Sequence, residues 1–244
     1  MIQELFLAFI QAATEFLPIS SSGHLALIFN IISEPDLFFI TMLHLASLFA
    51  VLIFTRREIK KLLTFDKKYR KLWIYLIIAT IPAALFGYLF KSTIESSFES
   101  LLFLGFAFLF TGGILFFTKY TQNYTKLNWK NSLFVGLFQV IALFPGISRS
   151  GMTISSGLFS GLRKEDAVKF SFLLFIPLSL GAFVLEFGQA YFNTTLVYSF
   201  LLTFVLSLIF LNLLYFIVKK GKFWWFSIYC FVLGIVTLVL HFFS

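Results

Sequence analysis

The sequence predicts an all-α membrane protein with six transmembrane helices and two re-entrant helical hairpins, arranged as an inverted-topology repeat. Three observations support this fold class: the composition, the spacing of apolar runs, and two interrupted stretches that match each other. Hydrophobic residues make up 59% of the 244 residues and charged residues 12%, which lies outside the range of soluble globular domains. We therefore expect one integral membrane domain over residues 1–244.

Charge and cysteine content exclude several classes of function. The formal net charge is +8, but the basic residues lie in short runs between apolar segments rather than on a solvated face. Nucleic acid is therefore not an expected partner. The single cysteine, Cys230, allows neither an intramolecular disulfide nor a thiolate metal site. Residues 1–4 carry no basic run, so a cleaved secretory signal is not expected.

Six apolar runs have the length of about 20 residues that a membrane-spanning helix needs. They cover approximately residues 37–55, 72–90, 101–118, 167–187, 196–218 and 223–243. Residues 2–32 and 131–161 are also apolar, but a cluster of Pro, Ser and Gly interrupts each stretch in its middle. A helix, a loop and a second helix that enters the membrane and returns would fit both. Such irregular backbone is tolerated at membrane depth only beside protein or a water-filled cavity.

The distribution of basic residues favours the hairpins over single spans. With two hairpins, 17 of the 19 Lys and Arg residues fall on one side, Lys91 stays on the other, and Arg149 lies within the membrane. With two single spans, the split would be 11 against 7. The positive-inside rule then places the basic loops in the cytoplasm. We expect a multi-pass protein of the cell membrane, with both termini and the opening of the site on the exterior side.

Residues 11–25 match residues 139–153 without a gap, at an offset of 128 residues. The identical pairs are Gln11/Gln139, Phe16/Phe144, Ile19/Ile147, Ser20/Ser148, Ser22/Ser150 and Gly23/Gly151. The informative differences are Glu15/Leu143, Ser21/Arg149 and His24/Met152. The pattern indicates two repeats, about 1–120 and 130–244, whose hairpins divide the chemistry between them. Inverted repeats with broken helices are a known way to build a membrane-embedded ion or anion site.

The first hairpin carries polar groups that are costly at membrane depth. Gln11 and Glu15 lie on one helix face at spacing i, i+4, and a carboxylate there costs about 2.5–3.5 kcal/mol on insertion scales. Metal coordination or general-base catalysis would explain it, and so would a structural hydrogen bond between helices. Ser20, Ser21 or Ser22 can cap the following helix, whose first N–H groups attract an anion.

His24 lies about one turn into that second short helix and is predicted to face the same opening. It is a candidate catalytic residue, the alternative being a structural histidine. In the second hairpin, Gly146 allows close backbone approach, Ser148 and Ser150 supply hydroxyl groups, and Arg149 suits phosphate oxygens. The alternative is that Arg149 only pairs with Glu15 to join the hairpins.

These residues form two motifs. The first is Gln11-x3-Glu15 followed by Phe-Leu-Pro-Ile-Ser-Ser-Ser-Gly-His24, and the second is Pro145-Gly-Ile-Ser-Arg149-Ser-Gly-Met-Thr153. Together they resemble the undecaprenyl-diphosphate phosphatase family linked to bacitracin resistance. This family admits Glu or Gln at the position of Gln11, and Gln here leaves Glu15 as the one carboxylate of the first motif.

The resemblance implies hydrolysis of undecaprenyl diphosphate to undecaprenyl phosphate and inorganic phosphate, which recycles the lipid carrier for cell-wall synthesis. It also implies dependence on Mg²⁺ or Ca²⁺, with Glu15 and Gln11 as metal ligands. The implied catalytic residues are His24, Glu15, Ser21 and Arg149. The implied substrate-binding residues are Ser20, Ser22, Gly146, Ser148, Ser150 and Thr153.

The expected mechanism places the terminal phosphate on Arg149, with His24 as nucleophile or general base and Ser21 as the rival nucleophile. The C55 tail would enter sideways from the membrane lipids. The rival function is a polyprenyl-phosphate transporter or flippase on the same inverted repeat, and a purely structural role for the hairpins is a third reading. The oligomeric state stays open, a homodimer being one option.

Overall fold

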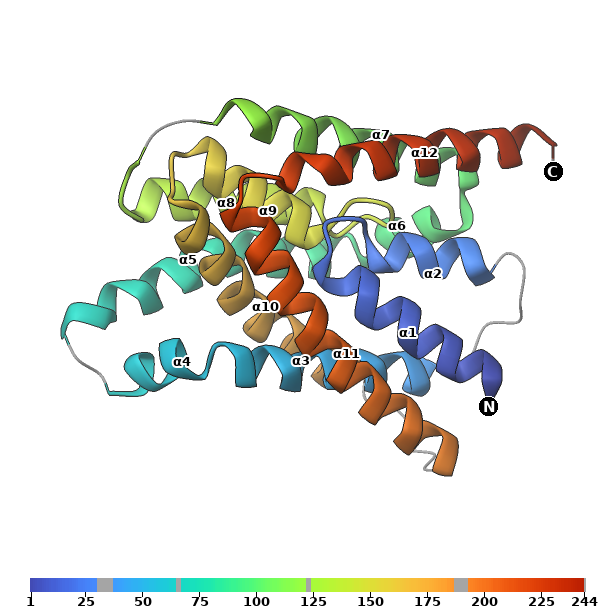
Figure 1. Cartoon of the computed structure of the whole chain (residues 1–244), viewed down its shortest axis with the longest axis horizontal. Helices are drawn as coiled ribbons and strands as arrows, with labels where there is room; N and C mark the ends of the chain where they lie inside the picture. Colours follow the sequence, from blue (N-terminus) through green and yellow to red (C-terminus); the bar gives the residue numbers. More distant parts are fainter. Residues whose placement is uncertain (30–36, 65–66, 122–123, 187–192, 244) are drawn as a thin grey trace.

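The computed structural model describes residues 1–29, 37–64, 67–121, 124–186 and 193–243, and these residues form helices joined by short loops (Figure 1). The α-helices are α1 (Ile2–Phe16), α2 (Ser21–Phe29), α3 (Leu37–Phe54), α4 (Arg56–Leu63), α5 (Lys67–Leu89), α6 (Lys91–Ser96), α7 (Leu101–Phe117), α8 (Trp129–Ile141), α9 (Arg149–Phe159), α10 (Lys164–Glu186), α11 (Thr194–Lys219) and α12 (Phe226–Phe243). This confirms the predicted all-α membrane class.

Five segments of the described chain are long and apolar enough to cross a membrane. They are Tyr69–Leu89, Leu101–Tyr120, Lys164–Val184, Thr194–Lys219 and Phe223–Phe243. The predicted span at 37–55 passes this test only together with α4, and the two helices are bent by 73° at the break. The end of the predicted span at residue 187 lies outside the described residues.

Both interrupted stretches break where the Pro, Ser and Gly clusters lie. α1 ends at Phe16, two residues before Pro18, and α2 starts at Ser21. α8 ends at Ile141, and α9 starts at Arg149. Figure 1 shows α2 returning toward the side of the molecule from which α1 starts. Neither stretch therefore continues as one straight helix, as predicted; residues 30–32 of the first stretch lie outside the described residues.

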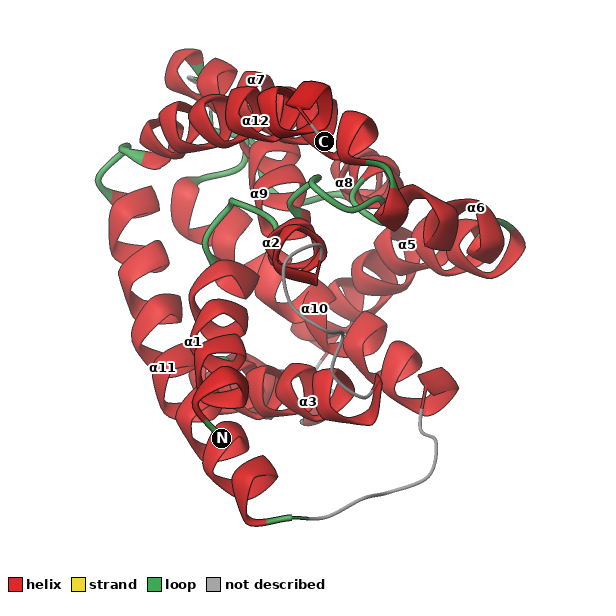
Figure 2. Cartoon of the chain, turned by 90° about the vertical axis from the view of Figure 1, so that its right-hand side faces the viewer, coloured by secondary structure: helices red, strands yellow, loops and turns green. Residues whose placement is uncertain are grey.

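The first helix of each hairpin packs against a long helix from the other half of the sequence. α1 packs against α11, and its counterpart α8 packs against α5. α7 and α12 lie side by side along one face of the molecule (Figure 2). Their contact is close because Gly234 has no Cβ: one added there would lie 2.9 Å from the Gly105 carbonyl oxygen. The division into two repeats and their inverted orientation in the membrane stay predictions.

Candidate active site

The turn of the first hairpin is stabilised by its own serines. Ser20 has a φ of +68°, a left-handed conformation that residues other than glycine seldom adopt. Its Oγ accepts a hydrogen bond from the Gly23 N–H at 3.3 Å and lies 3.3 Å from the Ser22 Oγ. Ser20 therefore caps α2, as predicted for one of the three serines.

The second turn repeats these contacts 128 positions later. The Ser148 Oγ accepts a hydrogen bond from the Gly151 N–H at 3.1 Å and lies 3.2 Å from the Ser150 Oγ. Gly146 has a φ of +84°, which glycine adopts without steric cost. The identities found in the sequence thus coincide with shared hydrogen bonds in the two turns.

The two turns are in direct contact. A Cβ placed on Gly23 would lie 2.8 Å from the Cα of Gly146, and one placed on Gly151 would lie 3.5 Å from the Cβ of Pro18. Pro18 and Gly146 occupy equivalent positions of the repeat. Each turn therefore presents a glycine to the matching position of the other, so the side chains that differ between the hairpins come together.

Glu15 is the centre of the polar cluster where the hairpins meet. Its Oε2 accepts hydrogen bonds from the Gln11 Nε2 at 2.9 Å and the Ser21 Oγ at 2.6 Å, and its Oε1 accepts one from the Arg149 guanidinium. The Glu15 side chain is 3% exposed and that of Arg149 is 24% exposed. The Arg149 guanidinium lies 4.0 Å from the centroid of the Phe175 ring, a cation–π contact. The predicted approach of the carboxylate and the guanidinium is confirmed.

His44 of α3 joins this cluster and was not identified from the sequence. Its Nε2 lies 3.7 Å from the Glu15 Oε2, and its Nδ1 is 3.0 Å from the Ile40 carbonyl oxygen. The signal that could have found it is an imidazole within an otherwise apolar predicted span. The His44 side chain is 39% exposed, so it lies at the rim of the cluster.

His24 has different partners from those we expected. Its Nδ1 lies 2.7 Å from the Ser20 carbonyl oxygen, and its Nε2 lies 2.7 Å from the Tyr229 hydroxyl. The imidazole stacks on the Tyr229 ring at 5.7 Å between centroids. In the neutral ring, Nδ1 donates to the carbonyl and Nε2 accepts from the tyrosine. The ring nitrogens are therefore occupied by Ser20 and Tyr229 rather than by Glu15 or Arg149.

The remaining predicted residues line or brace the junction. The Ser150 Oγ donates to the Leu17 carbonyl across the hairpins at 3.4 Å. The Gly146 carbonyl accepts a hydrogen bond from Thr111 of α7 at 2.9 Å. The Thr153 Oγ1 donates to the Arg149 carbonyl at 2.8 Å and lies 2.6 Å from the Ser171 Oγ. The Thr153 side chain therefore binds the α9 backbone and contacts α10.

A buried polar atom at the site has no partner among the residues that the structure describes. The Oε1 of Gln11 is buried and makes no hydrogen bond to them, beside a carboxylate whose oxygens already accept three. Hard divalent cations bind carboxylate and amide oxygens, so Gln11 and Glu15 fit part of a coordination sphere. Within the described residues, no group of three His, Cys, Asp or Glu side chains could hold a metal ion. Further ligands would have to come from substrate and water.

Comparison with known proteins identifies the family. Residues 4–236 match the family described as Bacitracin resistance protein BacA. The chain belongs to this family. It is 44% identical over 241 residues to an undecaprenyl-diphosphatase of Thermosipho africanus, covering 95% of this chain and 96% of that protein. Proteins of the same name from Methanococcus maripaludis and Thermotoga maritima are each 40% identical, covering 97% and 96% of this chain and 98% of each relative.

Proposed function

We propose that this chain is a membrane-embedded phosphatase that hydrolyses undecaprenyl diphosphate to undecaprenyl phosphate and inorganic phosphate. The observation that carries the proposal is the Glu15 carboxylate, which binds a hydroxyl from its own hairpin and a guanidinium from the other. Its relatives are named undecaprenyl-diphosphatase. No relative compared above is named as a transporter, so the carrier alternative has no support.

Arg149 is the group suited to hold the terminal phosphate. Phosphoryl transfer depends chiefly on positioning and on neutralising charge at the phosphoryl oxygens. A guanidinium offers several N–H donors in a planar fork, and one N–H donor of Arg149 is held by Glu15. No other hydrogen bond of its side chain is found among the described residues, so its remaining donors can bind phosphate while the carboxylate keeps the side chain oriented.

Ser21 is the nucleophile that the geometry favours over His24. Its Oγ donates to Glu15, so the carboxylate can accept the proton when the oxygen attacks the terminal phosphorus. The new Ser21 O–P bond replaces the bridging O–P bond, and undecaprenyl phosphate leaves with the bridging oxygen. Water then hydrolyses the phosphoserine, releasing inorganic phosphate and returning the proton to Ser21. His24, held by Tyr229, would position α2 rather than react.

A divalent cation, Mg²⁺ or Ca²⁺, fits the unpartnered Oε1 of Gln11 and the Glu15 carboxylate. Such an ion would supply positive charge opposite the diphosphate oxygens, which would complete its coordination together with water. Serine hydroxyls and backbone N–H groups of the two turns would bind the rest of the head group. The site would open to the exterior of the cell membrane, with the C55 tail lying in the bilayer.

The experiment is phosphate release from undecaprenyl diphosphate by the purified protein in detergent, where no compartments exist. The proposal predicts turnover that falls when a chelator removes divalent cations and returns when Mg²⁺ is added. An Arg149→Ala variant should release almost no phosphate. Absence of phosphate release by the folded wild-type protein, with Mg²⁺ and with Ca²⁺, would contradict the proposal.

A further inference from the structure

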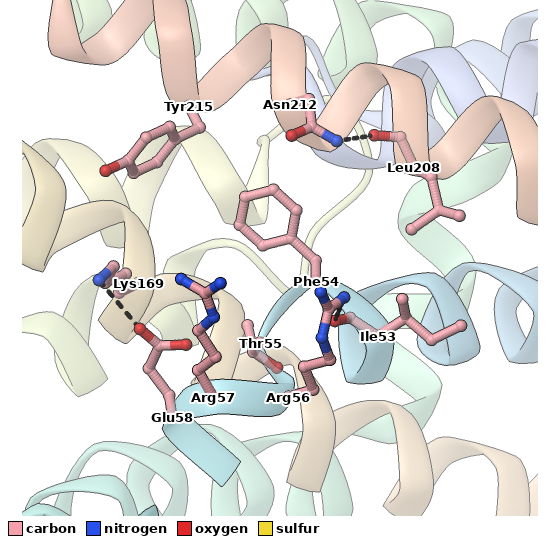
Figure 3. A pocket seen from close by; sticks show the side chains of 10 residues that line it. All are labelled: Ile53, Phe54, Thr55, Arg56, Arg57, Glu58, Lys169, Leu208, Asn212 and Tyr215. Atoms are coloured by element: carbon pink, nitrogen blue, oxygen red, sulfur yellow. Dashed lines mark hydrogen bonds and ion pairs between the residues drawn. The ribbon is translucent and has the colours of Figure 1, made fainter. Parts of the chain in front are cut away.

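A cavity lined by polar residues lies at the junction of α3 and α4, beside α10 and α11. Its volume is about 330 Å³. Figure 3 shows the Arg56 and Arg57 side chains rising from the start of α4 toward Asn212 and Tyr215 of α11. Successive helical residues normally point about 100° apart. Both guanidinium groups nevertheless line the same cavity, which lies at the 73° bend between α3 and α4.

The cavity has an excess of positive charge. Its carboxylate, Glu58, pairs with Lys169 at 2.9 Å, so these two charges compensate each other. Among the ion pairs of the described residues, none involves Arg56 or Arg57. Arg56 donates to the Ile53 carbonyl at 3.3 Å, a contact that leaves its charge uncompensated. Two guanidinium groups therefore face one cavity without a counter-ion from the described protein.

Packed aromatic rings separate this cavity from the Glu15–Arg149 pair. Phe54, in the cavity wall, packs edge-on against Phe172 at 5.4 Å between centroids. Phe172 contacts Phe16 at 6.2 Å, and Phe16 contacts Phe175 at 5.6 Å. Phe175 in turn lies beneath the Arg149 guanidinium. The cavity is thus a separate site rather than an extension of the hydrolytic one.

We propose that this cavity binds a phosphate group, and that an anionic phospholipid headgroup supplies it. Guanidinium groups form strong charge-assisted hydrogen bonds with phosphate oxygens, and the Tyr215 hydroxyl adds a neutral donor. The cavity lies at the end of the apolar helix α3, beside Ile53 and Leu208, and Ile53 is 42% exposed. A headgroup in the cavity would leave its acyl chains against this apolar surface, which a free phosphate ion would not use.

The test compares lipid binding by native mass spectrometry of the purified full chain, titrated with phosphatidylglycerol. The pocket variant is Arg56→Gln with Arg57→Gln. Its matched control is Lys60→Gln with Lys61→Gln, which removes the same charge from exposed positions of the same helix outside the cavity. We expect about tenfold weaker phosphatidylglycerol binding in the pocket variant and little change in the control. Phosphate release in detergent shows that both variants are folded.

Titrations with zwitterionic phosphatidylcholine and with inorganic phosphate identify the source of the anion. Phosphatidylcholine should bind weakly and without dependence on the arginines. Binding of inorganic phosphate with the same arginine dependence, and without selective phosphatidylglycerol binding, would support the phosphate chemistry and overturn the lipid as its source. Equal loss of phosphatidylglycerol binding in the pocket and control variants would show that surface charge alone explains the effect, and would overturn the proposed site. A pocket variant that binds both probes as the wild type does would also overturn the site.

Discussion

The turns of the two hairpins share the same serine hydrogen bonds and carry different chemistry. In each, a serine caps the second helix through an N–H three residues later and lies beside a second serine hydroxyl. Three groups that react or bind in the proposed mechanism lie at positions that differ: Glu15 and Ser21 in the first hairpin, and Arg149 in the second. The comparison indicates that the duplicated turns bring the two sets of groups together, and that neither hairpin is a complete site.

The largest expected effect comes from removing both charges that join the hairpins. Glu15→Gln combined with Arg149→Met should lower phosphate release by at least about 10³-fold. Stability should change little, since replacing a whole buried ion pair with neutral groups is often nearly neutral. Phosphate release and thermal unfolding measure the two effects. Leu143→Met, at the position equivalent to Glu15, is the control. A folded double variant with near-normal phosphate release would show that the ion pair has only a structural role.

Ser21→Ala should lower phosphate release by about 10³-fold, because it removes the proposed nucleophile. Ser22→Ala is the matched control, since its hydroxyl lies beside Ser20 rather than Glu15, and it should retain activity within about tenfold. Rapid acid quenching with labelled substrate should trap an acid-stable phosphate ester. Acid-labile label on a nitrogen would instead assign the attack to His24.

The contact between the turns is tested by adding one methyl group. In Gly23→Ala, the new Cβ would lie 2.8 Å from the Gly146 Cα and 2.6 Å from Phe108. Backbone cannot yield as a side chain can, so we expect a loss of about 1–3 kcal/mol in stability and lower activity. Gly113→Ala is the control, because nothing lies within 4 Å of its Cβ position. Equal behaviour of the two variants would show that the turns do not require this close approach.

Tyr229→Phe should have the smallest effect on activity. It leaves the His24 Nε2 without its hydrogen-bond donor, which should cost about 1–3 kcal/mol of stability. The activity should fall less than in Ser21→Ala, because His24 would position α2 rather than attack phosphate. Tyr198→Phe, on the exposed surface of α11, is the control. A loss of activity as large as that of Ser21→Ala would give His24 a catalytic role.

Local sequence signals predicted the all-α membrane class, the two helix breaks and the approach of Glu15 to Arg149. Pro18 and Pro145 lie in the two breaks together with serine and glycine residues, whereas Pro82 and Pro177 lie inside the helices α5 and α10. The cluster of Pro, Ser and Gly, rather than proline alone, therefore marks each break. The approach of Glu15 to Arg149 could be predicted because the repeat aligned the two motifs. The bend between α3 and α4 carries no such signal, as Thr55 and Arg56 are both compatible with a continuing helix.

The unpredicted contacts join residues far apart in the chain. Tyr229 meets His24 across 205 positions, and His44 reaches Glu15 from a helix outside both motifs. Only tertiary packing creates these pairs, so no spacing rule identifies them. The His24 ring is held between the Ser20 carbonyl oxygen, 2.7 Å from its Nδ1, and the Tyr229 hydroxyl, 2.7 Å from its Nε2.

The central claim, that both hairpins form one site, is tested most directly by a double-mutant cycle across them. Gln11→Leu and Arg149→Lys should each lower kcat/KM partially, so the double variant remains measurable. If both side chains act on one substrate head group, the double variant should be about tenfold more active than the product of the two losses predicts. Losses that multiply without coupling would contradict a shared site.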